Sequence, residues 1–259
     1  MSAERPPSRR RPVVAANWKM NLLKAEAIDF CRALRRGLAA SDALLEQTAR
    51  IVIFPSFPLI PVVARELVDN EVAVGGQDLH PEDKGAHTGD VSGRQLADAG
   101  CSWVLCGHSE RRRDHGESDE LIARKVATAV RLGLTPMLCV GETRTQRKAG
   151  RTFEVLGRQL RRALAGRPEP VAIAYEPVWA IGTGDTATPE MAQEAHAFMR
   201  GVVEELMGEG APAIPIVYGG SVTPENADGL IEQEAIDGFL VGGASLDPHR
   251  FLAIIRVSG

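Results

Sequence analysis

IPIVYGGSVTPENADGLIEQEAIDGFLVGGAS (residues 214–245) carries the clearest indication of the fold. Two short apolar runs in it end in glycine pairs, YGGSV (218–222) and VGGAS (241–245). Between them, Thr223-Pro224 is typical of a helix start, because threonine caps helices and proline suits the first helical position. A strand, a helix and a second strand predict two parallel strands joined by a crossover. Both glycine pairs therefore lie at the same edge of a parallel sheet.

The same alternation extends over the rest of the chain. Six further apolar runs precede these two: PVVAAN (12–17), RIVIF (50–54), EVAVGG (71–76), CSWVLCG (101–107), LTPMLCVG (134–141) and PVAIAYE (170–176). Segments with helical spacing lie between the runs, and one of them carries Leu121, Ile122, Val126, Ala129 and Val130 before Gly133. Thr188-Pro189 and Asp247-Pro248 mark further helix starts. The sequence thus predicts eight strand-helix units.

Two folds have this order of elements. A doubly wound sheet carries its glycine-rich turn after the first strand, whereas the turn here is ANWKMN (16–21). Glycine-rich turns after the seventh and eighth strands are typical of the phosphate site of a (β/α)8 barrel. We therefore predict an α/β protein with a single (β/α)8 barrel and a parallel eight-stranded core over residues 13–259, without a linker.

Residues 1–12, MSAERPPSRRRP, carry four arginines and one glutamate without apolar periodicity, which predicts a disordered basic arm. An arm that binds nucleic acid or a membrane needs more positive charge. The chain of 259 residues has a formal net charge of −4, so we expect no nucleic-acid partner. No stretch approaches the roughly 20 apolar residues of a membrane span, and none resembles a secretory signal. We expect a cytoplasmic protein without membrane contact.

The cysteines give no sign of a metal site. Cys31, Cys101, Cys106 and Cys139 form no CxxC pair, and no histidine stands at metal-ligand spacing from them. Their apolar surroundings predict reduced, buried side chains, with a reactive thiol as the alternative.

Polar residues at the carboxyl ends of strands are candidates for an active site, because barrel active sites are built there. In the first strand, alternation places Asn17 and Lys19 on one side, where both can point into the barrel mouth. After the fourth strand, His108 follows Gly107 at a strand-to-helix turn, where backbone N–H groups and the helix dipole favour a neutral imidazole. Taken singly, such a lysine is usually a solvated charge, and a lone histidine is usually structural or exposed.

Glu176 ends the sixth strand on the same side as Ala172 and Ala174, small residues that leave room at the barrel mouth. The alternative, an ordinary surface glutamate, requires the strand to end earlier. PVWAIGTGDTAT (177–188) follows directly and has the features of a lid. Gly182 and Gly184 permit conformations that bulkier residues resist, and the neighbouring apolar residues would exclude water on closing. A plain surface turn is the alternative, but it leaves that apolar run exposed.

The two glycine pairs predict an anionic ligand. Each brings bare backbone N–H groups close to an anion beside a helix N-terminus. One such pair is commonplace at turns, but two on adjacent strands beside a lid point to a phosphorylated ligand.

The motifs NWKMN (17–21), GHSERR (107–112), AYEPVWAIGTG (174–184), YGGSV (218–222) and LVGGASL (240–246), in this order, resemble those of the triosephosphate isomerase family. The resemblance runs from about residue 12 to the C-terminus. It implies a TIM barrel that interconverts D-glyceraldehyde 3-phosphate and dihydroxyacetone phosphate by proton transfer through an enediolate. It also implies that the reaction needs no cofactor and no metal.

The same resemblance implies the catalytic roles. Glu176 is then the base that moves the proton between the two carbons, and neutral His108 polarises the carbonyl and shuttles the hydroxyl proton. Lys19 and Asn17 join His108 as donors toward the negative charge that develops on oxygen.

Further residues follow from the resemblance for the phosphate and for the support of His108. Glu110 stands behind His108 without contacting the substrate, and Gly107 allows the turn before it. The phosphate is expected to accept hydrogen bonds from the backbone N–H groups of Gly182, Ser221, Gly242 and Gly243.

Members of this family are typically homodimers, in which the loop after the third strand enters a pocket beside the partner's active site. That loop is HPEDKGAHTGD (80–90) here. Thr88 is expected to approach Asn17 of the partner subunit and Lys19 of the partner subunit. His87 stands where an aromatic is common and Asp90 where glutamate is common, which bears on the dimer geometry.

Two questions stay open in the sequence. Asp185 stands at a lid position where the family pattern has lysine, which concerns the electrostatics of lid closure rather than the chemistry. An isomerase of a four-carbon phosphorylated sugar would keep the same motifs, and a barrel that only binds sugar phosphates is the alternative from another class. Retention of Glu176, His108 and Lys19 together argues against the latter.

Overall fold

The structure is a computed structural model that describes residues 11–40, 49–68, 71–166, 168–180 and 187–259. Ten residues of the predicted N-terminal arm, 1–10, lie outside these ranges. Arg11 and Pro12 already belong to the folded part: the Arg11 guanidinium donates to the Ala49 carbonyl at 3.2 Å, and the Arg50 N–H donates to the Pro12 carbonyl at 2.7 Å. The barrel thus begins to make contacts two residues before the predicted boundary.

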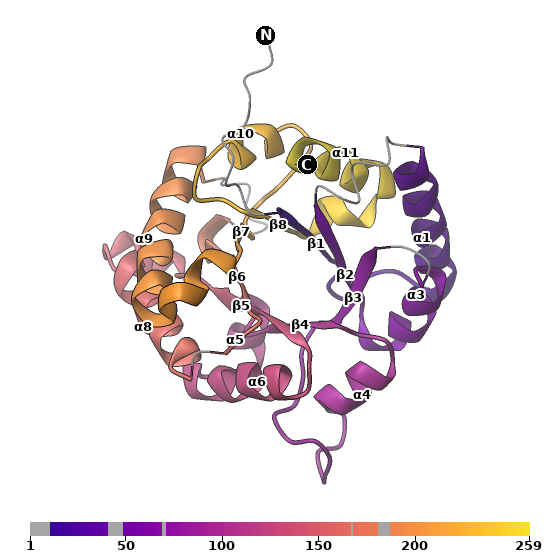
Figure 1. Cartoon of the computed structure of the whole chain (residues 1–259), viewed down its shortest axis with the longest axis horizontal. Helices are drawn as coiled ribbons and strands as arrows, with labels where there is room; N and C mark the ends of the chain where they lie inside the picture. Colours follow the sequence, from indigo (N-terminus) through magenta and orange to yellow (C-terminus); the bar gives the residue numbers. More distant parts are fainter. Residues whose placement is uncertain (1–10, 41–48, 69–70, 167, 181–186) are drawn as a thin grey trace.

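Eight parallel strands close into a barrel in chain order, with the first paired to the last (Figure 1). They are β1(Val13–Asn17), β2(Arg50–Phe54), β3(Val72–Gly76), β4(Trp103–Cys106), β5(Thr135–Val140), β6(Ala172–Tyr175), β7(Ile216–Tyr218) and β8(Gly238–Val241). Each strand falls within one of the eight apolar runs of the sequence. The predicted (β/α)8 barrel is confirmed.

Helices surround the strands and form the outer ring in Figure 1. The α-helices are α1(Lys24–Ala39), α3(Ile60–Glu66), α4(Gly93–Asp98), α5(Ser109–His115), α6(Asp119–Arg131), α7(Arg144–Lys148), α8(Thr152–Leu164), α9(Pro189–Met207), α10(Ala227–Ile231) and α11(Pro248–Ser258). Short 3-10 segments are η1(Phe57–Leu59), η2(Val178–Ala180), η3(Gly208–Ala213) and η4(Gly243–Leu246).

Two of the three predicted proline helix starts are confirmed. The side chains of Thr188 and Asp247 accept hydrogen bonds from backbone N–H groups in the first turns of α9 and α11. The prediction at Thr223 is wrong, because α10 begins only at Ala227 and has Asn226 as its N-cap residue. The Asn226 side chain accepts from the Thr223 N–H at 2.8 Å and holds the intervening residues in a turn.

The core has two layers because successive strand residues point to opposite faces. The outer layer packs the strands against the helices. The inner layer fills the barrel and comes from alternate strand residues: Val13, Ala15, Val52, Phe54, Trp103, Leu105, Met137, Cys139, Ala172, Ala174, Val217 and Leu240. The alternation that places Ala172 and Ala174 inside also turns Glu176 toward the barrel mouth.

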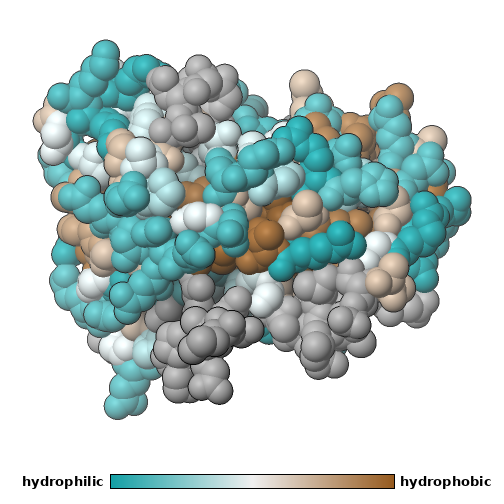
Figure 2. Space-filling view, turned by 90° about the horizontal axis from the view of Figure 1, so that it is seen from above, coloured by the Kyte–Doolittle hydropathy of each residue, from teal (hydrophilic) through white to brown (hydrophobic). Residues whose placement is uncertain are grey.

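The surface is largely hydrophilic. Figure 2 looks at the side of the molecule where α10 and α11 lie, and it shows a band of hydrophobic residues between hydrophilic ones. All four cysteines are buried with free thiols. No helix in the described ranges is both long and apolar enough to cross a membrane.

Candidate active site

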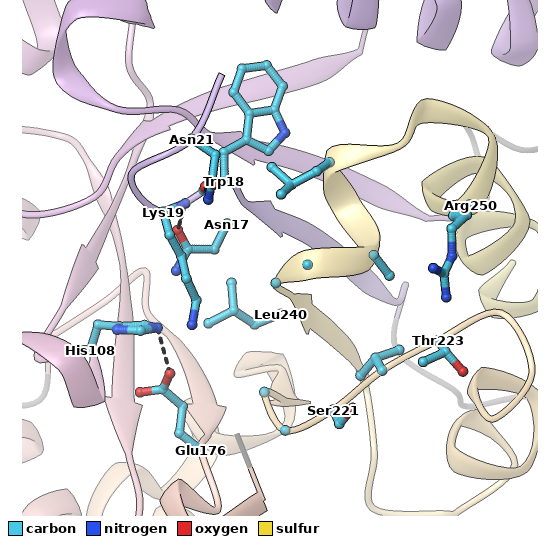
Figure 3. A pocket seen from close by; sticks show the side chains of 17 residues that line it. Asn17, Trp18, Lys19, Asn21, His108, Glu176, Ser221, Thr223, Leu240 and Arg250 are labelled. Carbon is cyan, nitrogen blue, oxygen red and sulfur yellow. Dashed lines mark hydrogen bonds and ion pairs between the residues drawn. The ribbon is translucent and has the colours of Figure 1, made fainter. Parts of the chain in front are cut away.

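A cavity of about 410 Å³ opens where the strands end. Seven of the predicted site residues line it together: Asn17, Lys19, His108, Glu176, Ser221, Gly242 and Gly243. They come from the ends of five strands that are far apart in the sequence, as barrel geometry requires. Figure 3 shows His108 and Glu176 on one side of the cavity, Ser221 on another, and the Lys19 side chain extending toward His108 and Glu176.

Glu176 is only 2% exposed, so the alternative of an ordinary surface glutamate is wrong. Its Oε1 lies 2.8 Å from His108 Nε2, and its Oε2 accepts from the Ser109 N–H at 2.8 Å. Burial raises the pKa of Glu176, but the charge and hydrogen bond of His108 and the Ser109 N–H together lower it by more. The net pKa lies below its ordinary value, so the carboxylate is ionised at neutral pH.

The backbone at Glu176 needs a glycine on the neighbouring strand. A Cβ at Gly141 would lie 1.7 Å from the Glu176 carbonyl oxygen. Only glycine lets these two backbone segments approach each other so closely. The Glu176 N–H donates to the Val140 carbonyl at 2.7 Å. Gly141 therefore fixes the position of the carboxylate, although the sequence offers only a strand-end glycine as a sign of it.

His108 is the N-cap residue of α5, and its ring orientation follows from the turn. Gly107 has φ +76°, in the left-handed region, which brings the imidazole into the cavity. Nδ1 accepts from the Glu110 N–H at 3.2 Å, so the ring is neutral with its proton on Nε2, facing Glu176.

The pKa of His108 differs from what the helix N-terminus alone predicts. Burial lowers the pKa of the imidazole, but the adjacent Glu176 carboxylate raises it by more. The net pKa therefore lies above its ordinary value. The sequence argument missed this influence because it could not place Glu176 next to the ring.

Lys19 is held in a strained backbone conformation, with φ +52°. Its N–H donates to Asn17 Oδ1 at 3.0 Å, and its carbonyl accepts from Gln77 Nε2 at 2.8 Å. Gln77 also donates to the Phe54 carbonyl at 3.0 Å. The sequence reasoning missed Gln77, although a polar residue directly after the third strand fits the rule that found the others.

The Lys19 side chain links the two ends of the cavity. Its Nζ lies 2.6 Å from Glu110 Oε1. Glu110 does not line the cavity, but it contacts the site through this ion pair with Lys19. A Cβ built at Gly242 would lie 3.6 Å from Lys19 Cε, and one at Gly243 would meet nothing within 4 Å. The turn at Gly242 and Gly243 thus presents bare backbone to open space within reach of the ammonium group.

The start of the predicted lid is anchored by a buried carboxylate that the sequence reasoning also missed. Glu142 is fully buried and accepts from Trp179 Nε1 at 2.8 Å and from the Tyr175 hydroxyl at 3.2 Å. Trp179 belongs to η2, at the beginning of the lid. Gly182, Gly184 and Asp185 lie outside the described residues.

Thr88 does not line this cavity. It lies on the exposed loop after β3, beside a second hollow of about 680 Å³. His80 and His87 stack in this loop with their ring centroids 3.9 Å apart, and Asp90 lies 3.9 Å from His80. Their potential ligand atoms lie within 4.8 Å of one another. Stacked rings direct their lone pairs side by side rather than toward one point, and His80 Nδ1 already accepts from the Glu82 N–H. We therefore assign no metal to this group.

Comparison with known proteins points to one family. The family model described as triosephosphate isomerase matches residues 12–258. A protein named triosephosphate isomerase from Moorella thermoacetica is 48% identical over 251 residues, which cover 95% of this chain and 98% of that protein. Another of that name, from Alkalilimnicola ehrlichii, is 49% identical over 254 residues, which cover 96% of this chain and 99% of that protein.

Proposed function

The chain belongs to the triosephosphate isomerase family, and from this premise we propose that it interconverts D-glyceraldehyde 3-phosphate and dihydroxyacetone phosphate. The reaction is an intramolecular aldose–ketose isomerisation, a step of glycolysis and gluconeogenesis. The observation that carries the proposal is one cavity that holds a buried carboxylate, an imidazole and an ammonium group beside two glycine turns.

We propose that Glu176 acts as the base. Its carboxylate takes a proton from the hydroxyl-bearing carbon next to the carbonyl, and the electron pair moves to the carbonyl oxygen to give an enediolate. The same group then returns the proton to the neighbouring carbon. The low pKa of Glu176 supports this role, because the group must be ionised before it accepts the proton.

His108 and Lys19 stabilise the enediolate in this mechanism. The Nε2–H group of His108 donates to the oxygen on which charge develops and transfers the hydroxyl proton between the two oxygens. Lys19 and Asn17 add positive charge and a donor near the same atoms. The strained Lys19 backbone, held by Gln77, supports this role because it keeps the group in place before the substrate arrives.

Glu176 must give up two hydrogen bonds to reach the substrate, because His108 and the Ser109 N–H hold both of its oxygens. Once the carboxylate leaves, His108 loses the charge that raises its pKa. Burial then favours the neutral ring. His108 therefore stays in the neutral state in which it serves as a hydrogen-bond donor.

At the other end of the cavity, the phosphate would accept hydrogen bonds from backbone N–H groups at Ser221, Gly242 and Gly243. The bare backbone at Gly242 and Gly243, close to Lys19, supports this assignment, and Ser221 lines the same cavity. Gly182 of the lid completes the set by resemblance to the family.

We also propose that the active form is a homodimer. Met20 and Leu23 are large apolar residues that are 93% and 74% exposed in the single chain, and both follow closely on Lys19 in the sequence. Such exposure so close to a catalytic group is accounted for when a second copy covers it. The loop carrying Thr88 would then enter beside Asn17 of the partner subunit.

The catalytic domain in this proposal is residues 13–259. We further propose that the protein acts in the cytoplasm, where its four buried thiols stay reduced.

The experiment that tests the function compares kcat/KM of the purified protein on D-glyceraldehyde 3-phosphate and on a four-carbon sugar phosphate. We expect the three-carbon substrate to be preferred by at least about a hundredfold, because specificity depends on the space around the sugar end. Preference for the four-carbon substrate, or no turnover of either, contradicts the proposal.

A further inference from the structure

Arg250 lines the same cavity but takes no part in the chemistry described above. It comes from the first turn of α11. In Figure 3 it lies on the side of Thr223, away from His108 and Glu176. A positive charge on this side stands near the glycine turns rather than near the reacting carbons.

Helix formation does not explain an arginine at this position. Asp247 caps α11 by accepting from the N–H groups of His249 and Arg250, at 2.8 and 3.2 Å. The helix N-terminus is the positive end of the helix dipole, so a cation in the first turn is disfavoured. A glutamate three residues after the N-cap residue would instead stabilise the helix by completing a capping box.

Ion pairing explains Arg250 no better. Its guanidinium lies 3.9 Å from Glu225 Oε2, and the two side chains are 50% and 76% exposed. Exposed pairs of this length contribute little to stability, since water screens them. Most of the positive charge of Arg250 therefore remains effective at the cavity mouth.

The other charged side chains of the cavity already have partners at short range. Lys19 has a carboxylate oxygen of Glu110 at 2.6 Å from its Nζ, and Glu176 faces His108 at 2.8 Å. The chain as a whole has a formal net charge of −4, which repels an anion at long range. An anionic ligand thus needs a local positive charge at the point where it enters.

We propose that Arg250 is a steering residue that draws the phosphate group of the substrate toward the glycine turns. The inference rests on the proposed function for the identity of the substrate, a phosphate ester with a charge near −2. Because Arg250 acts during encounter, it changes kcat/KM through KM and leaves kcat unaltered.

The test is kcat/KM of Arg250→Glu over a range of salt concentrations, with Arg162→Glu as the control. Arg162 of α8 is matched to Arg250: it is 53% exposed and pairs with Glu120 at 3.4 Å, and its substitution changes the net charge equally. For a separation of about 10 Å from a doubly charged phosphate, Arg250→Glu lowers kcat/KM about threefold at about 0.1 M salt and about sevenfold at about 0.01 M. Arg162→Glu is expected to change it by less than about 1.5-fold at either concentration.

A salt-independent loss in Arg250→Glu, a loss shared equally by both variants, or a fall in kcat overturns the steering role. Failure of the proposed function looks different, because the unaltered protein would then turn over no triose phosphate. In that case the affinity for inorganic phosphate, measured by phosphorus NMR titration, still tests Arg250. Weaker phosphate binding in Arg250→Glu than in Arg162→Glu supports steering of an anion, and equal affinities overturn it.

Discussion

Glu176 is the residue whose surroundings best show how one side chain is prepared for its reaction. Both of its carboxylate oxygens are bonded, to His108 and to the Ser109 N–H, while the side chain is almost fully buried. These bonds keep the group ionised in a site where burial alone would favour protonation. The pair of groups is therefore ready for proton transfer before a substrate enters.

We predict that Glu176→Gln lowers kcat by about a thousandfold or more, since the amide cannot accept the carbon-bound proton. The fold should be retained, because glutamine has the same size and its side-chain oxygen still accepts from the Ser109 N–H. Steady-state kinetics together with thermal unfolding separate the two effects. Turnover within about tenfold of the unaltered protein in a folded variant would remove Glu176 as the base.

At the scale of elements, α5 connects His108, the proposed proton shuttle, to the rest of the barrel. It begins after Gly107 and ends at Gly116, and both glycines have positive φ, +76° and +65°. A Cβ at Gly107 would lie 2.7 Å from the Ile122 side chain, whereas one at Gly116 would meet nothing within 4 Å. The two ends thus share backbone strain but differ in packing.

We predict that Gly107→Ala lowers kcat at least about tenfold, because relief of the clash moves His108. It should also destabilise the fold by about 1–3 kcal/mol more than Gly116→Ala, which adds backbone strain without overpacking. Gly116→Ala should leave kcat within about twofold of normal. Urea unfolding and steady-state kinetics on both variants check this, and equal kcat values would show that the turn does not position the ring.

The docking of α9 onto the barrel depends on a neutral histidine. His196 is fully buried, and its Nδ1 lies 3.3 Å from the Ala235 carbonyl oxygen. Burial lowers the pKa of His196 to about 3. The native ring therefore stays neutral down to about pH 3, while the unfolded chain takes up the proton below about pH 6.5.

Between these pH values the unfolded state binds one more proton, so the free energy of unfolding falls as the pH falls, by up to about 1.4 kcal/mol per pH unit. We predict that His196→Gln removes this contribution. The free energy of unfolding of the variant should then fall less steeply than that of the unaltered protein between about pH 6.5 and 4. Denaturant titrations at several pH values measure the two slopes, and parallel profiles would contradict the prediction.

The sequence predicts the elements better than it predicts their contacts. Apolar runs and glycine pairs identify all eight strands, and strand alternation places Asn17, Lys19 and Glu176 at one barrel mouth. Local patterns failed where a side chain competed with a motif: Asn226 shifts the start of α10 away from Thr223. Gln77 and Glu142 follow strand ends, as the predicted site residues do, but their partners Lys19 and Trp179 are distant in sequence, so local spacing does not show what they contact.

At the scale of the whole molecule, the exposed apolar residues that follow Lys19 in the chain are the ones that the proposed homodimer would cover. Leu23 and Val68 are both 74% exposed, but only Leu23 follows closely on Lys19 in the chain. The two positions provide a matched test of where the interface lies.

We predict that Leu23→Glu raises the dimer dissociation constant at least about tenfold, because it places a charge in a buried apolar contact. Val68→Glu should leave the dissociation constant unaltered. Sedimentation velocity over a range of protein concentrations measures both. Equal constants for the two variants would place the interface elsewhere, and a monomeric unaltered protein would refute the dimer.

The most direct test of the account is the isomerisation of dihydroxyacetone phosphate in D2O, followed by proton NMR of the product. If Glu176 removes a proton from carbon, the proton exchanges with solvent while it resides on the carboxylate. The glyceraldehyde 3-phosphate formed then carries deuterium at the carbon next to its carbonyl, and Glu176→Gln forms labelled product at least about a thousandfold more slowly. Product that forms at the normal rate with only protium at that carbon, as a hydride shift gives, would contradict the proton-transfer mechanism.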